Sequence, residues 1–394
     1  MHSFCNTMNP LPTKVFVLPN DADVFYLPKT DVGDGRHYEG EWLCNTTGSE
    51  YNGFTPFHCH PHGHGCVFDS DGSLMYEGGI RHGVFCGYGV YFVGGETRYA
   101  GSWEAGQFDG FGDYTYKCGA RYNGDFVKGM RHGHGLYTYA CGTNYSGSWR
   151  DDWRHGQGVQ RSVNGTKYEG DWEDGKRHGQ GFVVHEKSGT YYQGGYHDNQ
   201  WHGHGEWHDP GGGTVPGLNY KGAFMYGLRA GQGRLVFSDG HCIEGQFENN
   251  VAVHVRVDYT DGSSYTGGLC DNIFEGLGEF RGVNGVVYSG GWRNGRMHGE
   301  GRMDEGDCSW TGAWTNDFPE GIVLLEIGNA RFASTFASGV ETHCMRLPTT
   351  SDTTEDDKDG AAAGKAEVEG GAEADADFNS FMMDEDSAAA PAEL

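Results

Sequence analysis

The chain has 394 residues and a formal net charge of −27 at pH 7. This negative charge argues against nucleic acid as a partner and disfavours anionic membrane lipid without excluding it. Glycine contributes 69 residues with no collagen-like triplet, and aromatic residues make up 14% of the chain. Such a composition is typical of a folded, turn-rich β repeat and excludes a disordered chain.

Targeting signals and cysteine usage indicate the compartment. The sequence begins without a secretory signal, and no apolar run approaches the ~20 residues of a membrane-spanning helix. The 11 cysteines are odd in number and scattered, so we expect a reducing, intracellular compartment. Cys118 and Cys141 occupy the same place in successive repeats, ~9.6 Å apart on stacked hairpins. That separation exceeds the ~7 Å that a disulfide spans, so we expect no bond between them.

Residues 1–37 lack the pattern that fills most of the chain. They contain two short apolar segments broken by prolines. We predict an N-terminal cap or extension here. A cap has a physical rationale, because an exposed strand edge promotes aggregation.

A single phrase recurs from residue 38 to residue 328. Its clearest copy, Tyr168–Gly181, reads aromatic-x-Gly-x-aromatic, then a polar turn, then His-Gly-x-Gly. A fixed period of about 23 residues indicates a repeat architecture. We count about twelve or thirteen copies. The other copies start at Tyr38, Tyr51, Tyr76, Tyr99, Tyr122, Tyr145, Tyr192, Tyr220, Ile243, Tyr265, Tyr288 and Trp310.

The spacing within one copy predicts a β-hairpin. Tyr168, Gly170 and Trp172 are two residues apart and share one face of a strand, whereas Glu169 and Asp171 face water. The glycine lets an aromatic ring lie over its backbone. A lone hairpin is marginally stable in water, but stacked hairpins bury each other's aromatic faces.

The copy that starts at Tyr51 contains a run of histidines and cysteines. Two of these histidines belong to the His-Gly-x-Gly phrase itself. Zinc prefers His and Cys ligands, but the remaining spacing matches no standard zinc framework. We therefore expect no metal site and keep only four weak candidates: His58, Cys59, His60 and Cys66.

The last part of the chain departs from the regular pattern. The copy opened by Ile243 lacks His-Gly-x-Gly and predicts a kink or a weaker joint. Residues 329–346 are predicted to form a C-terminal cap. Residues 347–394 are acidic and alanine-rich, so we expect a disordered tail. Within it, residues 377–384 place two phenylalanines and two methionines between acidic residues. They form either a short docking motif or a residual apolar cluster.

The recurring phrase resembles the MORN repeat (membrane occupation and recognition nexus) over residues 38–328. The resemblance implies an all-β, elongated, single-layer solenoid of stacked antiparallel hairpins, followed here by the acidic tail. It also implies an aromatic-lined, protein-binding groove, interrupted at the irregular copies that start at Tyr51 and Ile243. The residues that would form this groove are Tyr99, Trp103, Tyr122, Phe126, Tyr145, Trp149, Tyr168 and Trp172.

Members of this family include lipid kinases, membrane-junction proteins and stand-alone cytoskeletal scaffolds such as a radial-spoke-head component. Repeats followed by an acidic tail are most similar to the stand-alone axonemal kind. We therefore expect a non-enzymatic, cofactor-free protein-binding scaffold in the cytoplasm and cytoskeleton, most of all in the axoneme of a cilium or flagellum. Its partners would be proteins of that assembly. The sequence leaves homodimerisation open.

The alternative is a phosphoinositide-associated organiser of membrane and cytoskeleton. It would bind lipid through basic turns such as Gly175-Lys-Arg-His and Gly129-Met-Arg-His. An enzyme is disfavoured, because the sequence has no phosphate-binding loop, no strand-to-helix dinucleotide motif and no zinc-protease pair.

Overall fold

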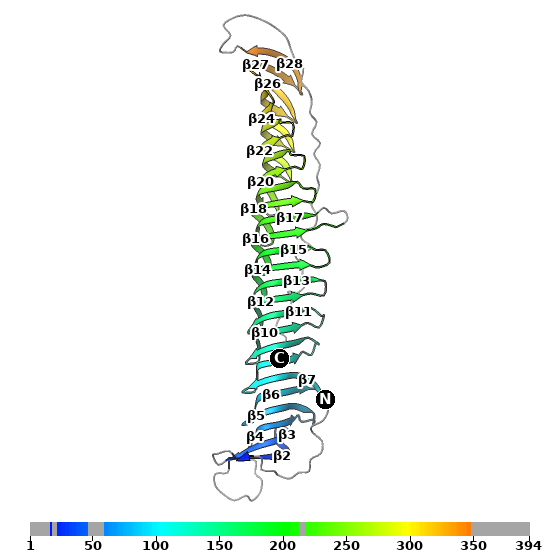
Figure 1. Ribbon diagram of the computed structural model, residues 1–394, viewed down its shortest axis with the longest axis vertical. Coiled ribbons are helices and arrows are strands. Elements are labelled where there is room, and N and C mark those ends of the chain that lie inside the picture. The colour runs from blue at the N-terminus through cyan, green and yellow to red at the C-terminus, as the bar shows by residue number, and fades with distance from the viewer. Residues whose placement is uncertain (1–15, 18–21, 46–58, 213–216, 348–394) are drawn as a thin grey trace. The chain divides into compact units, whose positions relative to one another are not determined.

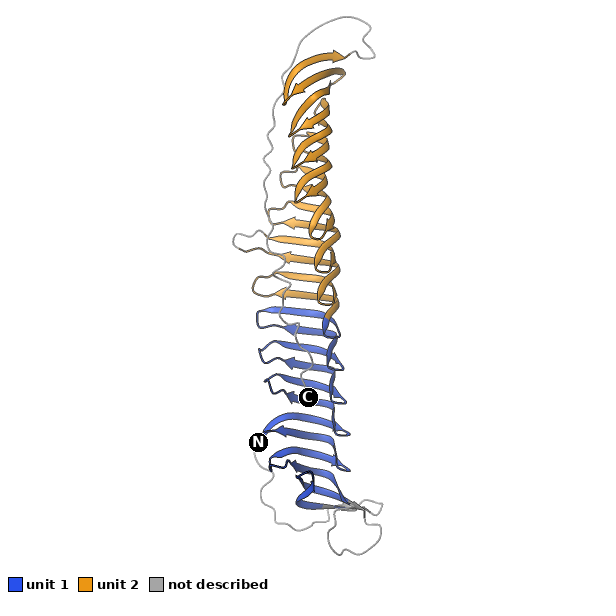
Figure 2. Ribbon diagram, turned by 180° about the vertical axis from the view of Figure 1, so that it is seen from behind, with its two compact units in different colours: residues 1–176 blue, residues 177–394 orange. Residues whose placement is uncertain are grey.

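Antiparallel strands make up the regular structure of the protein (Figure 1). The structure, a computed structural model, describes residues 16–17, 22–45, 59–212 and 217–347, and these contain no helix. The chain divides into two units, residues 1–176 and 177–394 (Figure 2). Within each unit every strand pairs with the next strand in sequence, so each unit is a single layer of stacked hairpins.

The first unit contains thirteen strands among its described residues. They are β1 (Phe16–Val17), β2 (Ala22–Gly33), β3 (Arg36–Asn45), β4 (Cys59–Phe68), β5 (Leu74–Arg81), β6 (Val84–Val93), β7 (Glu96–Glu104), β8 (Gln107–Thr115), β9 (Arg121–Val127), β10 (Met130–Thr138), β11 (Asn144–Arg150), β12 (Trp153–Arg161) and β13 (Thr166–Glu173).

The second unit continues the same pattern. Its strands are β14 (Lys176–His185), β15 (Tyr191–His197), β16 (Gln200–Asp209), β17 (Leu218–Met225), β18 (Leu228–Phe237), β19 (Cys242–Glu248), β20 (Val251–Asp258), β21 (Ser264–Cys270), β22 (Ile273–Arg281), β23 (Val287–Arg293), β24 (Arg296–Glu305), β25 (Cys308–Thr315), β26 (Phe318–Ile327), β27 (Ala330–Ala337) and β28 (Val340–Leu347). The segment predicted as a cap, residues 329–346, thus falls in one more hairpin, formed by β27 and β28.

Two-residue turns close the hairpins. In the turn between β23 and β24, Asn294 and Gly295 have φ angles of 49° and 76°. Positive φ at both positions defines the type I′ turn, whose twist matches the right-handed twist of the flanking strands. Other turn pairs, such as Tyr226 and Gly227 with φ angles of 50° and 83°, share this conformation.

The first aromatic residue of each regular copy is the centre of its hairpin. Tyr122 is fully buried, and its hydroxyl donates a hydrogen bond of 2.9 Å to the carbonyl oxygen of Asp125. The pairing of β9 with β10 shifts register just beyond this point, which frees that carbonyl from the ladder. The same bond, at 2.7 to 3.0 Å, is made by Tyr38, Tyr76, Tyr99, Tyr145, Tyr168, Tyr192, Tyr220, Tyr265 and Tyr288.

The two glycines of His-Gly-x-Gly have different roles. Gly133 has a φ of 58°, which lets β10 form its bulge. Gly135 pairs with Gly124 of the neighbouring strand. A Cβ atom on Gly135 would overlap the ring of Tyr122, so this glycine leaves the space that the ring occupies. An aromatic ring therefore lies over a strand glycine, as expected. The ring of Tyr122 belongs to β9, which pairs with the strand of Gly135, β10.

The second aromatic residue of each copy joins neighbouring hairpins. Trp149 contacts its own Tyr145 edge-on at 5.3 Å between ring centroids. It also contacts Tyr122 of the preceding copy at 5.4 Å. Its indole nitrogen donates a hydrogen bond of 3.3 Å to the carbonyl oxygen of Gly135. Each hairpin therefore completes the core of the one before it.

The irregular copy opened by Ile243 keeps the hairpin by a compensating change. Ile243 stands where other copies have tyrosine, and Val255 pairs with Gly245 where other copies have a second glycine. Without a tyrosine ring the space is open, and the buried Val255 side chain occupies it. Strands β19 and β20 pair along their length, so the strand ladder continues through this copy.

We predict that Gly233→Ala destabilises the second unit. The added Cβ would meet ring carbons of Tyr220 at 2.5 and 2.6 Å, and both groups belong to the tightly paired β17–β18 hairpin. Overpacking of this kind costs about 1–3 kcal/mol in the free energy of unfolding, measurable by chemical denaturation. Gly212→Ala is the matched control, because nothing lies within 4 Å of its Cβ position. Equal stability of the two variants would contradict the assigned role of the ring.

We also predict a loss of stability in alkali. Burial raises the pKa of Tyr220, Tyr265 and Tyr288 from 10.0 to about 12. The neutral form is favoured in the folded state, so the stabilisation is complete below pH 10 and is lost as pH rises from 10 through 12. Denaturation midpoints should be level below pH 10 and fall above it, with tyrosinate absorbance appearing together with unfolding. Tyr288→Phe should weaken this dependence.

Candidate protein-binding surface

The eight aromatic residues predicted to line a groove are buried in the structure. Their exposed fractions range from 0% for Tyr99, Tyr122 and Tyr145 to 7% for Trp103. Phe126, Trp149, Tyr168 and Trp172 fall between these values. These side chains therefore form the core of the first unit, and the surface that a partner could touch is built by other residues.

One position of the core holds an aromatic ring in some copies and an arginine in others. In the copy opened by Tyr99, Phe108 stacks on the tyrosine ring at 4.0 Å. In the copy opened by Tyr145, Arg154 takes this place, with its guanidinium carbon 4.1 Å from the ring centroid of Trp172. A guanidinium over an aromatic face replaces ring stacking by a cation–π contact.

The basic turns proposed as lipid contacts are partly engaged in this way. Arg131, in the Gly129-Met-Arg-His turn, lies 4.5 Å from the ring centroid of Trp149. Its Nε donates a hydrogen bond of 2.9 Å to Asp152, and its side chain is 15% exposed. The charge of Arg131 is thus neutralised and largely covered, which leaves little of it for a lipid phosphate.

The residue before the first glycine of His-Gly-x-Gly has a structural role in several copies. Its side chain accepts a hydrogen bond from the backbone N–H that opens the turn of the following hairpin. The pairs are Asp109 with Lys128 at 3.1 Å, His132 with Asp151 at 3.5 Å, Glu275 with Asn294 at 2.9 Å and Glu320 with Ser338 at 2.9 Å. Among the periodic histidines, His132 makes this bond, whereas the Nδ1 atoms of His62, His155, His202 and His298 are buried without a hydrogen-bond partner.

The weak zinc candidates do not assemble within the described residues. Cys59 is disulfide-bonded, and its strand partner in register is Cys44. Its sulfur is therefore not a free thiolate that could bind zinc. Cys66 is buried, and His58 lies outside the described residues. No group of three or more His, Cys, Asp or Glu in the described ranges is placed to hold a metal ion.

Cys118 and Cys141 test the spacing of successive repeats. They are not joined by a disulfide, as the repeat spacing predicts.

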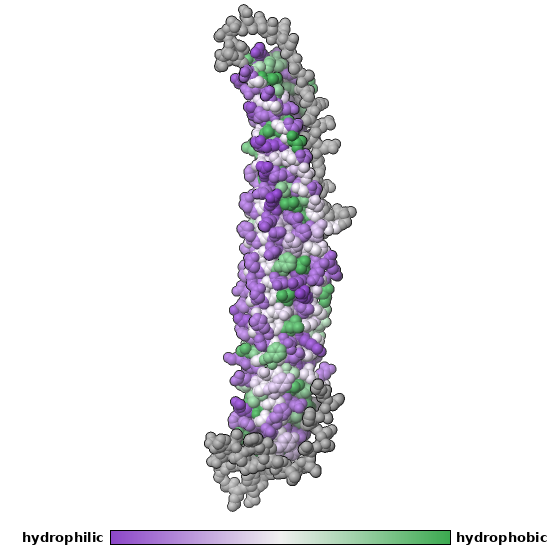
Figure 3. All heavy atoms as spheres, viewed as in Figure 1, coloured by the Kyte–Doolittle hydropathy of each residue, from purple (hydrophilic) through white to green (hydrophobic). Residues whose placement is uncertain are grey.

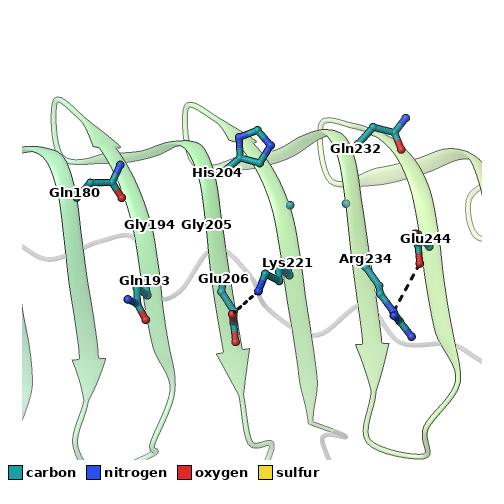
Figure 4. Close-up of a pocket in the computed structure, with 12 residues that line it drawn as sticks. Gln180, Gln193, Gly194, His204, Gly205, Glu206, Lys221, Gln232, Arg234 and Glu244 are labelled. Carbon is teal, nitrogen blue, oxygen red and sulfur yellow. Dashed lines mark ion pairs between the residues drawn. The ribbon is translucent and has the colours of Figure 1, made fainter.

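A polar trough crosses β14 to β19 of the second unit (Figure 4). Its volume is about 600 Å³. The floor is the backbone of the paired glycines 194 with 205 and 222 with 233. One wall carries Gln180, His204 and Gln232, and the other carries Gln193, Glu206, Lys221, Arg234 and Glu244.

The walls of the trough offer hydrogen-bond donors and acceptors with little net charge. Lys221 lies 3.4 Å from Glu206, and Arg234 lies 3.8 Å from Glu244. The amide of Gln232 donates a hydrogen bond of 3.1 Å to Gln246. An open trough with amide groups repeated once per hairpin suits the backbone of an extended polypeptide. These residues carry no distinctive signal in the sequence, because each belongs to the polar face of its own strand.

Comparison with protein-family profiles finds eight matches to the MORN repeat, at residues 76–97, 99–120, 122–143, 145–167, 168–184, 192–214, 220–242 and 288–304. All eight begin at predicted repeat starts. The copies opened by Ile243, Tyr265 and Trp310 lie outside these matches, yet each folds as a hairpin.

The other comparisons are less informative. No curated protein matches the chain. Among solved structures, one titled "Streptogramin B lyase structure" is 12% identical over 83% of this chain and 87% of that chain, with a TM-score of 0.10. A TM-score this low supports no argument. Across the described residues, no helix has the length and apolar character that a membrane crossing requires.

We predict that Arg154 stabilises the first unit mainly through its planar contact. Its Nη2 donates a hydrogen bond of 2.7 Å to the carbonyl oxygen of Gly175, and its guanidinium covers Trp172. Arg154→Ala should lower the free energy of unfolding by about 1–3 kcal/mol. Arg154→Phe should recover more of this loss than Arg154→Lys, because phenylalanine stacks at this position in the copy with Phe108. A fully stable Arg154→Lys would show that charge alone matters.

Proposed function

We propose that this chain, a MORN-repeat protein, is a non-enzymatic scaffold that holds protein partners on the polar face of its sheet. MORN repeats are associated with protein-binding and membrane-associated scaffolds. The observation that carries the proposal is the trough over β14 to β19, which is open, polar and repetitive. It offers hydrogen bonds along a line and has the character of a binding surface.

We further propose that the scaffold belongs to the cytoskeleton, and most of all to the axoneme of a cilium or flagellum. The support is the combination of MORN repeats with an acidic tail, which is similar to stand-alone axonemal scaffolds. The competing proposal is a phosphoinositide-associated organiser. It is weakened by Arg131, whose guanidinium contacts Trp149 and Asp152, and by the net charge of −27.

The proposal predicts that a tagged copy stays with the cytoskeleton after detergent extraction of its own cell. The double charge reversal Lys221→Glu and Arg234→Glu should move it to the soluble fraction, because it makes the trough strongly negative. Both residues lie in exposed ion pairs, which contribute about 0–1 kcal/mol, so folding should persist.

The matched control is the pair Arg256→Glu and Arg302→Glu, also exposed and ion-paired in the second unit but outside the trough. This variant should remain with the cytoskeleton. Release of the unaltered protein with the membrane fraction would favour the lipid organiser. Full solubility without a retained partner would contradict the scaffold proposal.

A further inference from the structure

We propose that the polar face of the first unit carries a binding site for a proline-rich segment with basic residues, centred on Tyr88 and Phe111. This inference rests on the proposed protein-binding function and names the chemistry of one partner. It concerns residues far in sequence from the trough of the second unit.

Tyr88 and Phe111 depart from the repeat at the same position. Each stands between the two glycines of the return strand, in Gly-Tyr-Gly and Gly-Phe-Gly. In the next two copies this position holds His134 and Gln157. The side chain here points away from the core, because the flanking Gly89 and Gly112 are the ones that the rings of Tyr76 and Tyr99 cover.

Both rings are open to a partner. Tyr88 is 67% exposed and Phe111 is 59% exposed, against 0% for the core tyrosines. We take these two exposed aromatic side chains, which lie in neighbouring copies, as the centre of the proposed site. Figure 3 shows a face of the protein on which hydrophilic residues predominate and hydrophobic residues form small groups.

Small residues lie between the two rings. Ser102 on β7 is the strand partner of Tyr88 on β6. A Cβ atom placed on Gly110, next to Phe111, would lie 3.0 Å from the Cβ of Ser102. The next outward residues on β6 and β7 are Val90 and Ala100, which are strand partners and extend this surface. The surface is thus two projecting rings with a low, partly apolar floor between them.

The spacing of the two strands that carry the rings matches one turn of a polyproline II helix. Tyr88 and Phe111 lie two strands apart, or ~9.6 Å at the usual strand separation. A polyproline II helix rises ~3.1 Å per residue, so one turn of three residues covers ~9.3 Å. Prolines three residues apart would therefore meet the two rings in register. Aromatic surfaces are the usual docking sites for this conformation. A preformed polyproline II helix loses little conformational entropy on binding.

The charges in the two rows of outward side chains that cross the strands at Tyr88 and at Val90 favour a basic partner, and the next rows on either side contain Arg81 and Arg98. Side chains that lie opposite one another on successive strands form rows across the sheet. From β5 to β9, the rows that contain Tyr88 and Val90 include three charged residues, Glu77, Asp113 and Asp125, and all three are acidic. Asp125 is the strand partner of Phe111. Glu77 and Asp113 are exposed. A proline-rich segment that carries arginine or lysine would thus gain attraction from both sides of the ring pair.

The test uses the full chain and fluorescence anisotropy with a labelled peptide of four Pro-Pro-Arg triplets. Two peptides of equal length are the controls. One has Gly-Gly-Arg triplets, with the same charge but without the polyproline conformation, and the other has Pro-Pro-Glu triplets. The proposal expects the Pro-Pro-Arg peptide to bind most tightly and its affinity to fall with added salt.

The matched variants follow what other copies carry. Tyr88→His combined with Phe111→Gln places at both positions residues that the same fold already accepts, so the protein should remain folded. It should weaken binding of the Pro-Pro-Arg peptide on the order of tenfold or more. Leu277→Gln is the control, because Leu277 stands at the equivalent position of the second unit and is 78% exposed. It should leave binding unchanged. Asp113→Asn should reduce affinity and its dependence on salt.

Several outcomes would overturn the proposal. Equal binding of the Gly-Gly-Arg peptide would reduce the interaction to charge alone. Unchanged binding by the Tyr88→His and Phe111→Gln protein would remove the rings from it. Absence of binding to the Pro-Pro-Arg peptide at millimolar concentration would exclude the site. None of these results affects the extraction test, so the scaffold proposal stands or falls separately.

Discussion

The structure depends on a tyrosine ring that lies over the backbone of a pair of glycines. The ring requires glycine at Gly135 because any Cβ there would enter its volume. Its hydroxyl bonds to a carbonyl that the neighbouring bulge releases from the ladder. Both interactions recur in copy after copy, so a single layer of hairpins acquires a buried interior. The copy with Ile243 and Val255 supports this account, because the ring and the glycine are replaced together.

A second consequence concerns the distribution of charge. The position that stacks on the tyrosine accepts Phe108 in one copy and Arg154 in another, because an aromatic face attracts either a ring or a guanidinium. Arginines that look like a basic surface in the sequence are therefore partly core residues. The aromatic residues of the repeat and several arginines belong to the interior. The side chains left for binding are those that point away from the core, between the glycines of the return strand and beside them.

These outward positions differ along the chain more than the core tyrosines and the glycines beneath them. In the second unit they form the trough between Gln180 and Glu244, whose ion pairs and amides offer polar contacts. In the first unit they present Tyr88 and Phe111 among acidic residues. A repeat that keeps its core tyrosine and glycines in most copies is free to vary its exterior, so one chain can offer chemically distinct surfaces. This property suits the proposed scaffold.

The sequence by itself determined the repeat, its hairpin unit, its period and its glycine and aromatic positions, because spacings of two residues decide which side chains share a face of a strand. The predicted groove residues were identified as one set, but only the tertiary structure placed them inside. Burial depends on how the next hairpin covers each ring, as Trp149 covers Tyr122, and one copy alone does not contain that contact. The trough could not be predicted from the sequence either, because its walls come from six successive strands. Tyr88 and Phe111 were visible in the sequence as aromatic residues between two glycines, yet their exposure followed only from the fold.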